Sequence, residues 1–185
     1  MNNEFIKRII SSIILLPIVY YAIIKGSFFF NCLILICISI ISYEWHMMSK
    51  NKKYYFFEFI FLFFSILSIY SLRNNFVGGA EYFLLILLIC IFTDIGGYIF
   101  GKLFKGPKLT KLSPNKTYSG VLGGYLLPII FITFLFYKTD FFFSDQINEL
   151  NIFLLIFFVS SISQIGDLII SYFKRLSKIK DTGKI

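Results

Sequence analysis

The feature that most restricts the fold of this chain is a series of six long stretches that are poor in charged residues. They cover Ile9–Ile24, Phe28–Tyr43, Tyr54–Leu72, Tyr82–Phe100, Tyr118–Tyr137 and Ile152–Phe173. A helix that crosses the hydrocarbon core of a bilayer needs about 20 mainly apolar residues, with a range of about 17 to 25. All six stretches meet or approach this length, although the first two are short enough that one of them could be tilted or re-entrant. We therefore expect an all-α, polytopic membrane helix bundle.

The composition excludes a water-soluble domain. Of the 185 residues, 57% are hydrophobic, 21% are aromatic and only 15% are charged, whereas a soluble domain of this length needs more charged side chains to cover its core. The three cysteines lie inside apolar stretches, where they are typical of small hydrophobic residues and not of disulfides or metal ligands. Extracellular disulfide scaffolds and zinc ribbons are therefore excluded.

The positions of the basic residues predict the topology. Cytoplasmic loops of membrane proteins collect lysine and arginine, and alternate segments here carry 15 of the 18 basic residues. The basic segments contain Lys7 and Arg8; Lys50, Lys52 and Lys53; Lys102, Lys105, Lys108, Lys111 and Lys116; and Lys174, Arg175, Lys178, Lys180 and Lys184. About six spans with both termini in the cytoplasm follow from this alternation. We expect a single membrane domain over residues 1–185, with a polar cytoplasmic loop at about residues 102–117.

Four acidic residues, Glu44, Glu58, Asp94 and Asp167, lie within or at the ends of apolar stretches. An ionisable group at membrane depth is costly, so it usually faces the interior of the helix bundle or a polar cavity. Glu58 follows a cluster of tyrosine and lysine residues, which favours an acid at the membrane interface. Asp94 and Asp167 are therefore the stronger candidates for a functional site.

Asp94 and Asp167 each precede basic residues on the same predicted helix face. The first face carries Asp94, Tyr98, Gly101, Lys102 and Lys105. The second carries Asp167, Ser171, Lys174, Arg175 and Lys178. Spacings of three and four residues put side chains on one side of a helix, and with a rise of about 1.5 Å per residue Asp94 lies about 12 Å deeper than Lys102. Two carboxylates near a basic cytoplasmic rim favour a hard-cation site of the magnesium type, because such a pair without a cation would be protonated or repulsive.

The segment Gly106–Gly120 is the one long polar segment of the chain, and two prolines break the helical pattern within it. Its lysines and hydroxyl groups precede a predicted helix, which favours the binding of phosphate groups. Neither a Walker loop nor a dinucleotide-binding fingerprint is present. On spacing alone, the lysines are as readily explained by positive-inside topology and contact with anionic lipids. The acids in the helices could equally serve an ion or proton relay in a transporter.

Glycines at intervals of four residues predict close packing between the fourth and fifth stretches. The pairs are Gly97 with Gly101 and Gly120 with Gly124. Small residues at this spacing let helix backbones touch in membranes.

Three motifs in order along the chain are similar to those of a known family. The first is Tyr43-Glu44-Trp45. The second is Thr93-Asp94 with Gly97, Tyr98 and Gly101, followed by Leu112-Ser113-Pro114-Asn115-Lys116-Thr117 and Gly120. The third is Gln164-x-Gly-Asp167-Leu-x-x-Ser171-x-x-Lys174-Arg175, followed by Lys180-Asp181-x-Gly183. Together they resemble the phosphatidate cytidylyltransferases (CDP-diglyceride synthases) over most of the chain, and the third motif is the most specific.

This resemblance implies a magnesium-dependent transfer of a cytidylyl group from CTP to the phosphate of phosphatidic acid, which gives CDP-diacylglycerol and pyrophosphate in phospholipid biosynthesis. It implies Mg²⁺ as the cofactor, with a monovalent cation as a further candidate. The expected partners are CTP, phosphatidic acid and membrane lipid, without nucleic acid, and a homodimer is a further expectation. The expected location is a bacterial cytoplasmic membrane.

The resemblance also implies roles for particular residues. The expected catalytic residues are Asp167, Lys174, Arg175 and Asp181, with Asp167 as the metal ligand. Lys174 and Arg175 would neutralise developing charge, and Asp94 and Asp181 would orient metal or substrate. The residues expected to bind substrate are Asp94, Ser113, Pro114, Lys116, Thr117 and Ser171.

The chain departs from the family pattern at two places. Ser119 stands where the family usually has glutamate. The family pattern also continues beyond Lys-Asp-x-Gly into a Pro-Gly-His-Gly-Gly-x-x-Asp-Arg-x-Asp stretch and a further helix, whereas this sequence ends at Ile185. We therefore expect a truncated member that keeps the fold and half of the metal site.

The alternative is a non-catalytic lipid-binding or transport protein built on the same fold. A transporter would be expected to show an inverted repeat with interrupted helices in both halves. Glycine-rich segments occur only around Gly96–Gly97 and Gly120–Gly124, with no counterpart in the first three stretches. The enzyme is therefore favoured.

Overall fold

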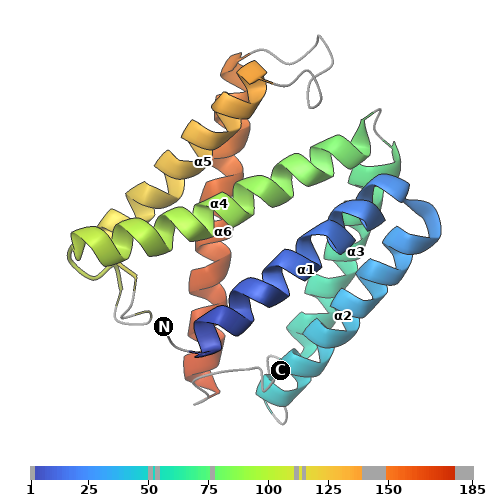
Figure 1. Cartoon of the computed structure of the whole chain (residues 1–185). Helices are drawn as coiled ribbons and strands as arrows, with labels where there is room; N and C mark the ends of the chain where they lie inside the picture. Colours follow the sequence, from blue (N-terminus) through green and yellow to red (C-terminus); the bar gives the residue numbers. More distant parts are fainter. Residues whose placement is uncertain are drawn as a thin grey trace. The chain divides into compact units, whose positions relative to one another are not determined.

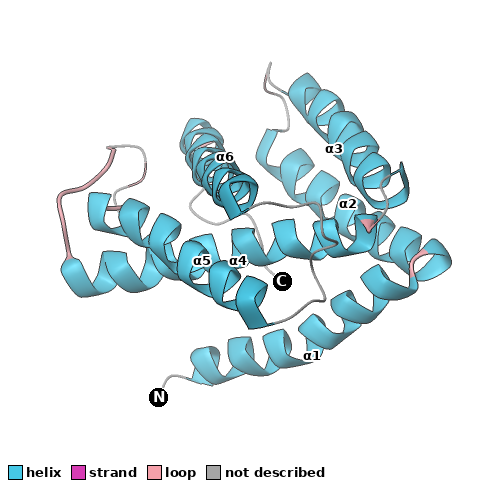
Figure 2. Ribbon diagram, turned by 90° about the horizontal axis from the view of Figure 1, so that it is seen from above, coloured by secondary structure: helices cyan, strands magenta, loops and turns pink. Residues whose placement is uncertain are grey.

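The computed structural model describes residues 3–49, 52, 55–75, 78–110, 113, 116–138 and 149–177. Six helices follow one another along the chain (Figure 1): α1 (Asn3–Lys25), α2 (Ser27–Ser49), α3 (Phe56–Asn75), α4 (Gly79–Phe104), α5 (Tyr118–Lys138) and α6 (Glu149–Leu176). The described residues contain no strand, only one isolated β-bridge between Lys108 and Thr117 (Figure 2). The all-α fold class is confirmed.

Each of the six predicted stretches corresponds to a helix, and every helix is longer than its stretch. For example, α4 begins at Gly79 and ends at Phe104, so it extends beyond both ends of the predicted stretch Tyr82–Phe100. Polar residues at a helix end continue the backbone hydrogen-bond ladder although they lower the local hydropathy. The expected start of the third stretch, Tyr54, lies outside the described residues.

Four of the described helices are long and apolar enough to cross a membrane by length and composition. They are α2, α4, α5 and the segment Leu150–Leu176 of α6, while α1 and α3 contribute shorter apolar segments, Ile14–Lys25 and Phe59–Asn74. Leu35, Phe63, Leu122 and Phe158 are each more than half exposed. Exposure of large apolar side chains along several helices is what a lipid environment favours and what water does not. The orientation of the termini stays a prediction.

The contacts gather the chain into two compact units, Met1–Leu84 and Leu85–Ile185. In the first unit α1 contacts α2 and α2 contacts α3. α1 ends in a tight turn because Gly26 adopts a left-handed conformation, with φ of 65°, and its N–H donates to the carbonyl of Ala22 at 3.0 Å. A glycine at this position after a helix is the common C-terminal cap. The single tryptophan of the chain, Trp45, is buried on α2 in this unit.

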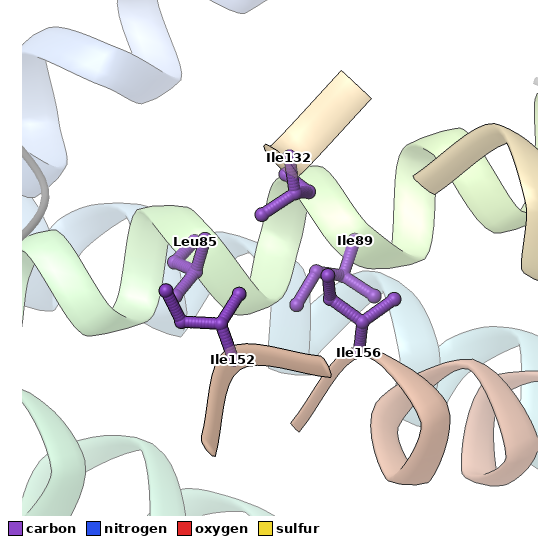
Figure 3. Packing of buried hydrophobic residues seen from close by; sticks show 5 residues of the cluster. All are labelled: Leu85, Ile89, Ile132, Ile152 and Ile156. Atoms are coloured by element: carbon purple, nitrogen blue, oxygen red, sulfur yellow. The ribbon is translucent and has the colours of Figure 1, made fainter. Parts of the chain in front are cut away.

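The second unit is held by a cluster of buried aliphatic residues from three helices. Leu85 and Ile89 come from α4, Ile132 from α5, and Ile152 and Ile156 from α6. Figure 3 shows these five side chains converging between the helices. α4 crosses α6 near this cluster (Figure 1), and just beyond it the Thr93 hydroxyl donates a hydrogen bond of 2.9 Å to Ser160. Both of these polar side chains are buried, so their mutual hydrogen bond removes the cost of placing two hydroxyls in an apolar interior.

The close contact between α4 and α5 depends on glycine. A Cβ atom on Gly120 would lie 2.8 Å from the carbonyl oxygen of Gly97, and one on Gly123 would lie 2.6 Å from that of Gly96. The predicted close packing of the two helices is thus confirmed, and both helices run unbroken through their glycines. The spacing pattern pointed to Gly97 and Gly120 but not to Gly96 and Gly123, which make the tighter contact.

We predict that Gly123→Ala destabilises the second unit by about 1–3 kcal/mol, the usual cost of overpacking a well-packed interface. The added Cβ would overlap the Phe100 side chain and press on the Gly96 carbonyl. Thermal unfolding in detergent, followed by circular dichroism, would measure the loss as a lower Tm.

Gly166→Ala on α6 is the matched control, because a Cβ there would meet no atom within 4 Å. Alanine is the better helix former by about 1 kcal/mol, so this control is expected to keep or raise the Tm. A Tm for Gly123→Ala equal to that of the control would show that the helices are not in close contact at Gly123.

Candidate active site

A polar cavity of about 300 Å³ lies in the second unit, between α4, α5, α6 and the segment that precedes α5. Its walls carry two carboxylates, one ammonium group and several hydroxyl groups. The lining residues are Thr93, Asp94, Gly97 and Tyr98 from α4; Ser113, Lys116 and Thr117 before α5; Gly120 and Val121 from α5; and Gln164 and Asp167 from α6. A concave site with a few convergent polar groups is the usual form of a small-molecule site.

The central contact in this cavity is an ion pair between Lys116 and Asp167. The Lys116 ammonium donates to the Asp167 carboxylate, and Nζ lies 2.8 Å from Oδ2. The Lys116 side chain is 28% exposed and that of Asp167 is 55% exposed, so both charges remain accessible to a ligand. The pair joins two residues that are 51 positions apart, and it compensates the charge of an acid that stands in a long apolar helix.

Backbone hydrogen bonds hold Lys116 in place. The Leu109 N–H donates to the Lys116 carbonyl at 2.8 Å, and the Tyr118 N–H donates to the Pro107 carbonyl at 3.1 Å. These bonds flank the isolated bridge between Lys108 and Thr117. The base of the polar segment is therefore closed like a short hairpin, and Lys116 emerges from it just before the first turn of α5.

Thr117 caps the N-terminus of α5. Its hydroxyl oxygen accepts a hydrogen bond of 3.1 Å from the N–H of Gly120, the usual bond of an N-terminal cap. The same hydroxyl lies 3.0 Å from that of Ser119, and Ser119 accepts from the N–H of Gly106 at 3.4 Å. Ser119, which stands where the resemblance expects glutamate, thus joins the two ends of the polar segment.

Four polar residues of α6 form one stripe along the helix, and only two of them, Asp167 and Ser171, are predicted from the sequence as site residues. Ser160, Gln164, Asp167 and Ser171 follow one another at steps of four, three and four residues, so they share one face of the helix. Ser160 bonds Thr93, while the Gln164 amide lies 3.5 Å from the Val121 carbonyl of α5. No role was predicted for Ser160, Gln164 or Thr93. The polar period within α6 is a signal that could have singled out Ser160 and Gln164, whereas the pairing of Ser160 with Thr93 depends on how α4 and α6 cross.

The structure brings together five of the predicted site residues. Asp94, Ser113, Lys116, Thr117 and Asp167 all line the cavity. Ser171, Lys174 and Arg175 lie further along α6 and do not line it; Lys174 is seven residues, or about 10 Å along the helix axis, from Asp167. Pro114 and Asp181 lie outside the described residues. The roles of all these residues stay predictions.

Asp94 and Asp167 supply the carboxylate oxygens of the cavity, the type of ligand that Mg²⁺ prefers. Within the described residues, no group of three His, Cys, Asp or Glu side chains comes together. Mg²⁺ commonly takes one or two carboxylates from the protein and completes its shell with water and substrate phosphates. The described residues of the cavity therefore fit a metal that is shared with a phosphorylated substrate, and by themselves they do not form an all-protein metal cage.

Comparison with known proteins gives the family of the chain. Residues 51–185 match the model of the cytidylyltransferase family. The phosphatidate cytidylyltransferase of Rickettsia bellii (strain RML369-C) is 35% identical over 194 residues, which cover 100% of this chain and 81% of the relative. That of Staphylococcus haemolyticus (strain JCSC1435) is 34% identical over 165 residues, which cover 82% of this chain and 58% of the relative.

The chain thus spans about four fifths of the rickettsial relative and less than two thirds of the staphylococcal one. No solved structure gives a significant match. Together with the four helices long enough to cross a membrane, the bacterial relatives identify a multi-pass protein of a bacterial cytoplasmic membrane.

We predict that Thr117→Val lowers the stability of the protein by about 1 kcal/mol, because it removes the hydroxyl that caps α5. Thr117→Ser keeps the cap and is expected to keep the stability. Thermal unfolding of both variants would measure the difference. A Tm for Thr117→Val equal to that of the serine variant would mean that the hydroxyl does not stabilise α5.

Proposed function

Because the chain belongs to the cytidylyltransferase family, we propose that it transfers the cytidylyl group of CTP to phosphatidic acid and releases pyrophosphate. The product is CDP-diacylglycerol. The observation that carries the proposal is the accessible ion pair of Lys116 and Asp167 in the polar cavity between α4, α5 and α6. Two of the three motifs named from the sequence contribute to this cavity, since Asp94, Ser113 and Lys116 come from the second motif and Asp167 comes from the third.

The cavity has the charges that such a substrate pair requires. CTP and phosphatidic acid are both anionic, and Lys116 presents an ammonium group to the cavity. Thr117, Gly120 and Val121 place the N-terminus of α5 in its wall, where the partial positive charge of the helix end favours phosphate. The exposed apolar surfaces of the surrounding helices give the acyl chains of phosphatidic acid a path in lipid, while CTP arrives from the aqueous side.

The reaction is a displacement at phosphorus. A phosphate oxygen of phosphatidic acid forms a bond to the α-phosphorus of CTP while the bond from that phosphorus to the bridging oxygen of the β-phosphate breaks. Pyrophosphate leaves with the electron pair of that bond. Such transfers depend on positioning and on stabilisation of charge, and they need no covalent nucleophile from the protein. Lys116 and the N-terminus of α5 bind and orient the phosphate groups, and the Thr117 and Ser119 hydroxyls keep that N-terminus in position.

Asp167 and Asp94 are the residues that would hold Mg²⁺. The metal would supply Lewis-acid stabilisation of the phosphate oxygens. Asp167 also holds the Lys116 ammonium at 2.8 Å, so it positions the main cation of the cavity. Two observations support the proposal of Mg²⁺ at this site. The cavity contains two carboxylates, and Mg²⁺ prefers carboxylate and phosphate oxygens as ligands. Lys174 and Arg175 continue the same helix towards its C-terminal end and would attract anionic substrates to the cavity.

We predict that Asp167→Asn abolishes CTP-dependent formation of CDP-diacylglycerol in membranes that contain the 185-residue chain. Lys116→Ala should reduce it by about 10² to 10³-fold, the usual cost of removing one group that stabilises developing charge. The assay follows radiolabelled CTP into the lipid phase with phosphatidic acid as acceptor.

Glu81→Gln and Lys138→Ala are matched controls, because they make the same kinds of change at positions that do not line the cavity. Both are expected to keep the activity. If the unchanged chain is inserted in the membrane and forms no product, the 185 residues do not carry the reaction by themselves. If Asp167→Asn is as active as the controls, Asp167 has no part in it.

Removal of divalent cations is expected to stop the reaction. EDTA in excess should bring product formation to background, and added Mg²⁺ should restore it. Sustained activity in EDTA, after washing of the membranes, would count against a metal at Asp94 and Asp167.

A further inference from the structure

The first unit contains a second polar cavity, which the proposed reaction does not use. It has a volume of about 340 Å³ and lies at the turn between α1 and α2, beside the last turn of α3. Arg73 and Asn74 of α3 line one side, and Ser27 and Asn31 of α2 line the other. All of these side chains except that of Arg73 are neutral, so the cavity has a net positive charge.

Arg73 is anchored by hydrogen bonds, and among the described residues it has no acidic partner. One terminal nitrogen, Nη2, donates to the carbonyl of Ile23 at 3.1 Å, the other, Nη1, donates to Asn74 at 3.2 Å, and the guanidinium lies 5.2 Å from the ring centre of Phe30. No carboxylate of the described residues lies within ion-pair distance of it. A guanidinium has five N–H donors. The hydrogen bonds seen among the described residues use two of them, and the buried Nε has no partner there.

An apolar groove adjoins this cavity. It runs between α2 and α3, has a volume of about 230 Å³ and is lined mainly by isoleucine and leucine. The groove and the cavity share Phe30, Asn31 and Tyr70 in their walls, so they are continuous. On α2 the groove extends from Phe30 to Ser39, which corresponds to about 14 Å along the helix axis. Its one hydroxyl on this side, that of Ser39, is bonded to the backbone of Leu35 at 2.8 Å, so the groove presents a hydrocarbon surface.

An apolar groove that adjoins a guanidinium with no acidic partner among the described residues matches the shape and charge of a phospholipid. We propose that the groove between α2 and α3 binds a glycerophospholipid, with one acyl chain along Ile34 and Leu35 and the phosphate at Arg73. Arginine is well suited to this ligand because its planar fork donates two parallel hydrogen bonds to phosphate. The Asn31 amide and the Tyr70 hydroxyl stand at the junction and can donate to the phosphate or to the ester oxygens below it.

The lipid of this site is not the substrate of the proposed reaction. On the topology predicted from the basic residues, Arg73 belongs to a segment on the outer side of the membrane, whereas CTP is cytoplasmic. The lipid would therefore come from the outer leaflet. Its role is structural, because it would join the ends of α1, α2 and α3 through Arg73, which already bonds the last turn of α1.

The test measures Tm for the purified 185-residue chain in detergent while dioleoyl phosphatidylglycerol is added. A saturable rise of about 5 °C is expected when the lipid exceeds its Kd 100-fold. Dioleoylglycerol has the same chains without the phosphate, and glycerol phosphate has the phosphate without the chains. Each is expected to give a much smaller shift, because the site needs both parts. An equal shift with dioleoylglycerol would overturn the assignment of Arg73 as a phosphate ligand.

Two tryptophan substitutions on α2 separate a specific site from general contact with lipid. Leu35→Trp fills the groove and is expected to abolish the shift. Ile36→Trp is the matched control, because Ile36 is similarly exposed but does not line the groove, and it should keep the shift. If both variants keep it or both lose it, the proposed site does not exist.

Arg73→Gln is expected to weaken phosphatidylglycerol binding at least tenfold and leave the small dioleoylglycerol shift unchanged. Should this variant fail to fold, the comparison of Leu35→Trp with Ile36→Trp decides alone. Asp167→Asn is expected to keep the full shift, which makes the test independent of the cavity of the proposed reaction. Loss of the shift in Asp167→Asn together with its retention in Leu35→Trp would place the lipid in that other cavity and overturn the proposal.

Discussion

The second unit depends on how closely two helix backbones can approach each other. Where α4 meets α5, the carbonyl oxygens of Gly96 and Gly97 occupy the space that side chains at Gly123 and Gly120 would need. Helices in lipid gain little from apolar burial, so tight van der Waals contact of this kind is a main source of their association. The contact also sets the position of the cavity, because Thr93 and Asp94 lie one turn before these glycines and Lys116 and Thr117 lie just before the partner helix begins.

The membrane environment also requires that a charged side chain within an apolar helix be compensated. Asp167 stands in a helix that is otherwise long and apolar, and its charge is compensated by Lys116 from a segment 51 residues earlier. The lysine is in turn fixed by backbone hydrogen bonds at the base of the polar segment and by the capped start of α5. The same pair therefore links α6 to the segment that precedes α5, and both charges remain accessible to a ligand.

Much of this arrangement could be predicted from the sequence, and the limits have physical causes. The six helices can be predicted from hydropathy because side chains that face the hydrocarbon of the membrane must be apolar. Hydropathy does not predict their ends, since the hydrogen-bond ladder of α4 continues beyond the apolar residues to Phe104. Asp94 and Asp167 could be named because a charge in an apolar helix needs an explanation, and Lys116 could be named because it lies in the one long polar segment of the sequence. The pairing of Thr93 with Ser160, and the contact of Gly96 with Gly123, depend on the crossing of helices, which a pattern within one helix does not specify.

The position of the single tryptophan has a practical consequence for biophysical work. Trp45 is buried on α2, in the unit Met1–Leu84, and the unit that contains the Lys116–Asp167 pair has none. Intrinsic tryptophan fluorescence therefore has its one source in the first unit. A change in emission would describe events around α2, and a ligand in the cavity between α4, α5 and α6 could bind without any spectral sign. The chain thus has a tryptophan probe in its first unit and none in its second unit.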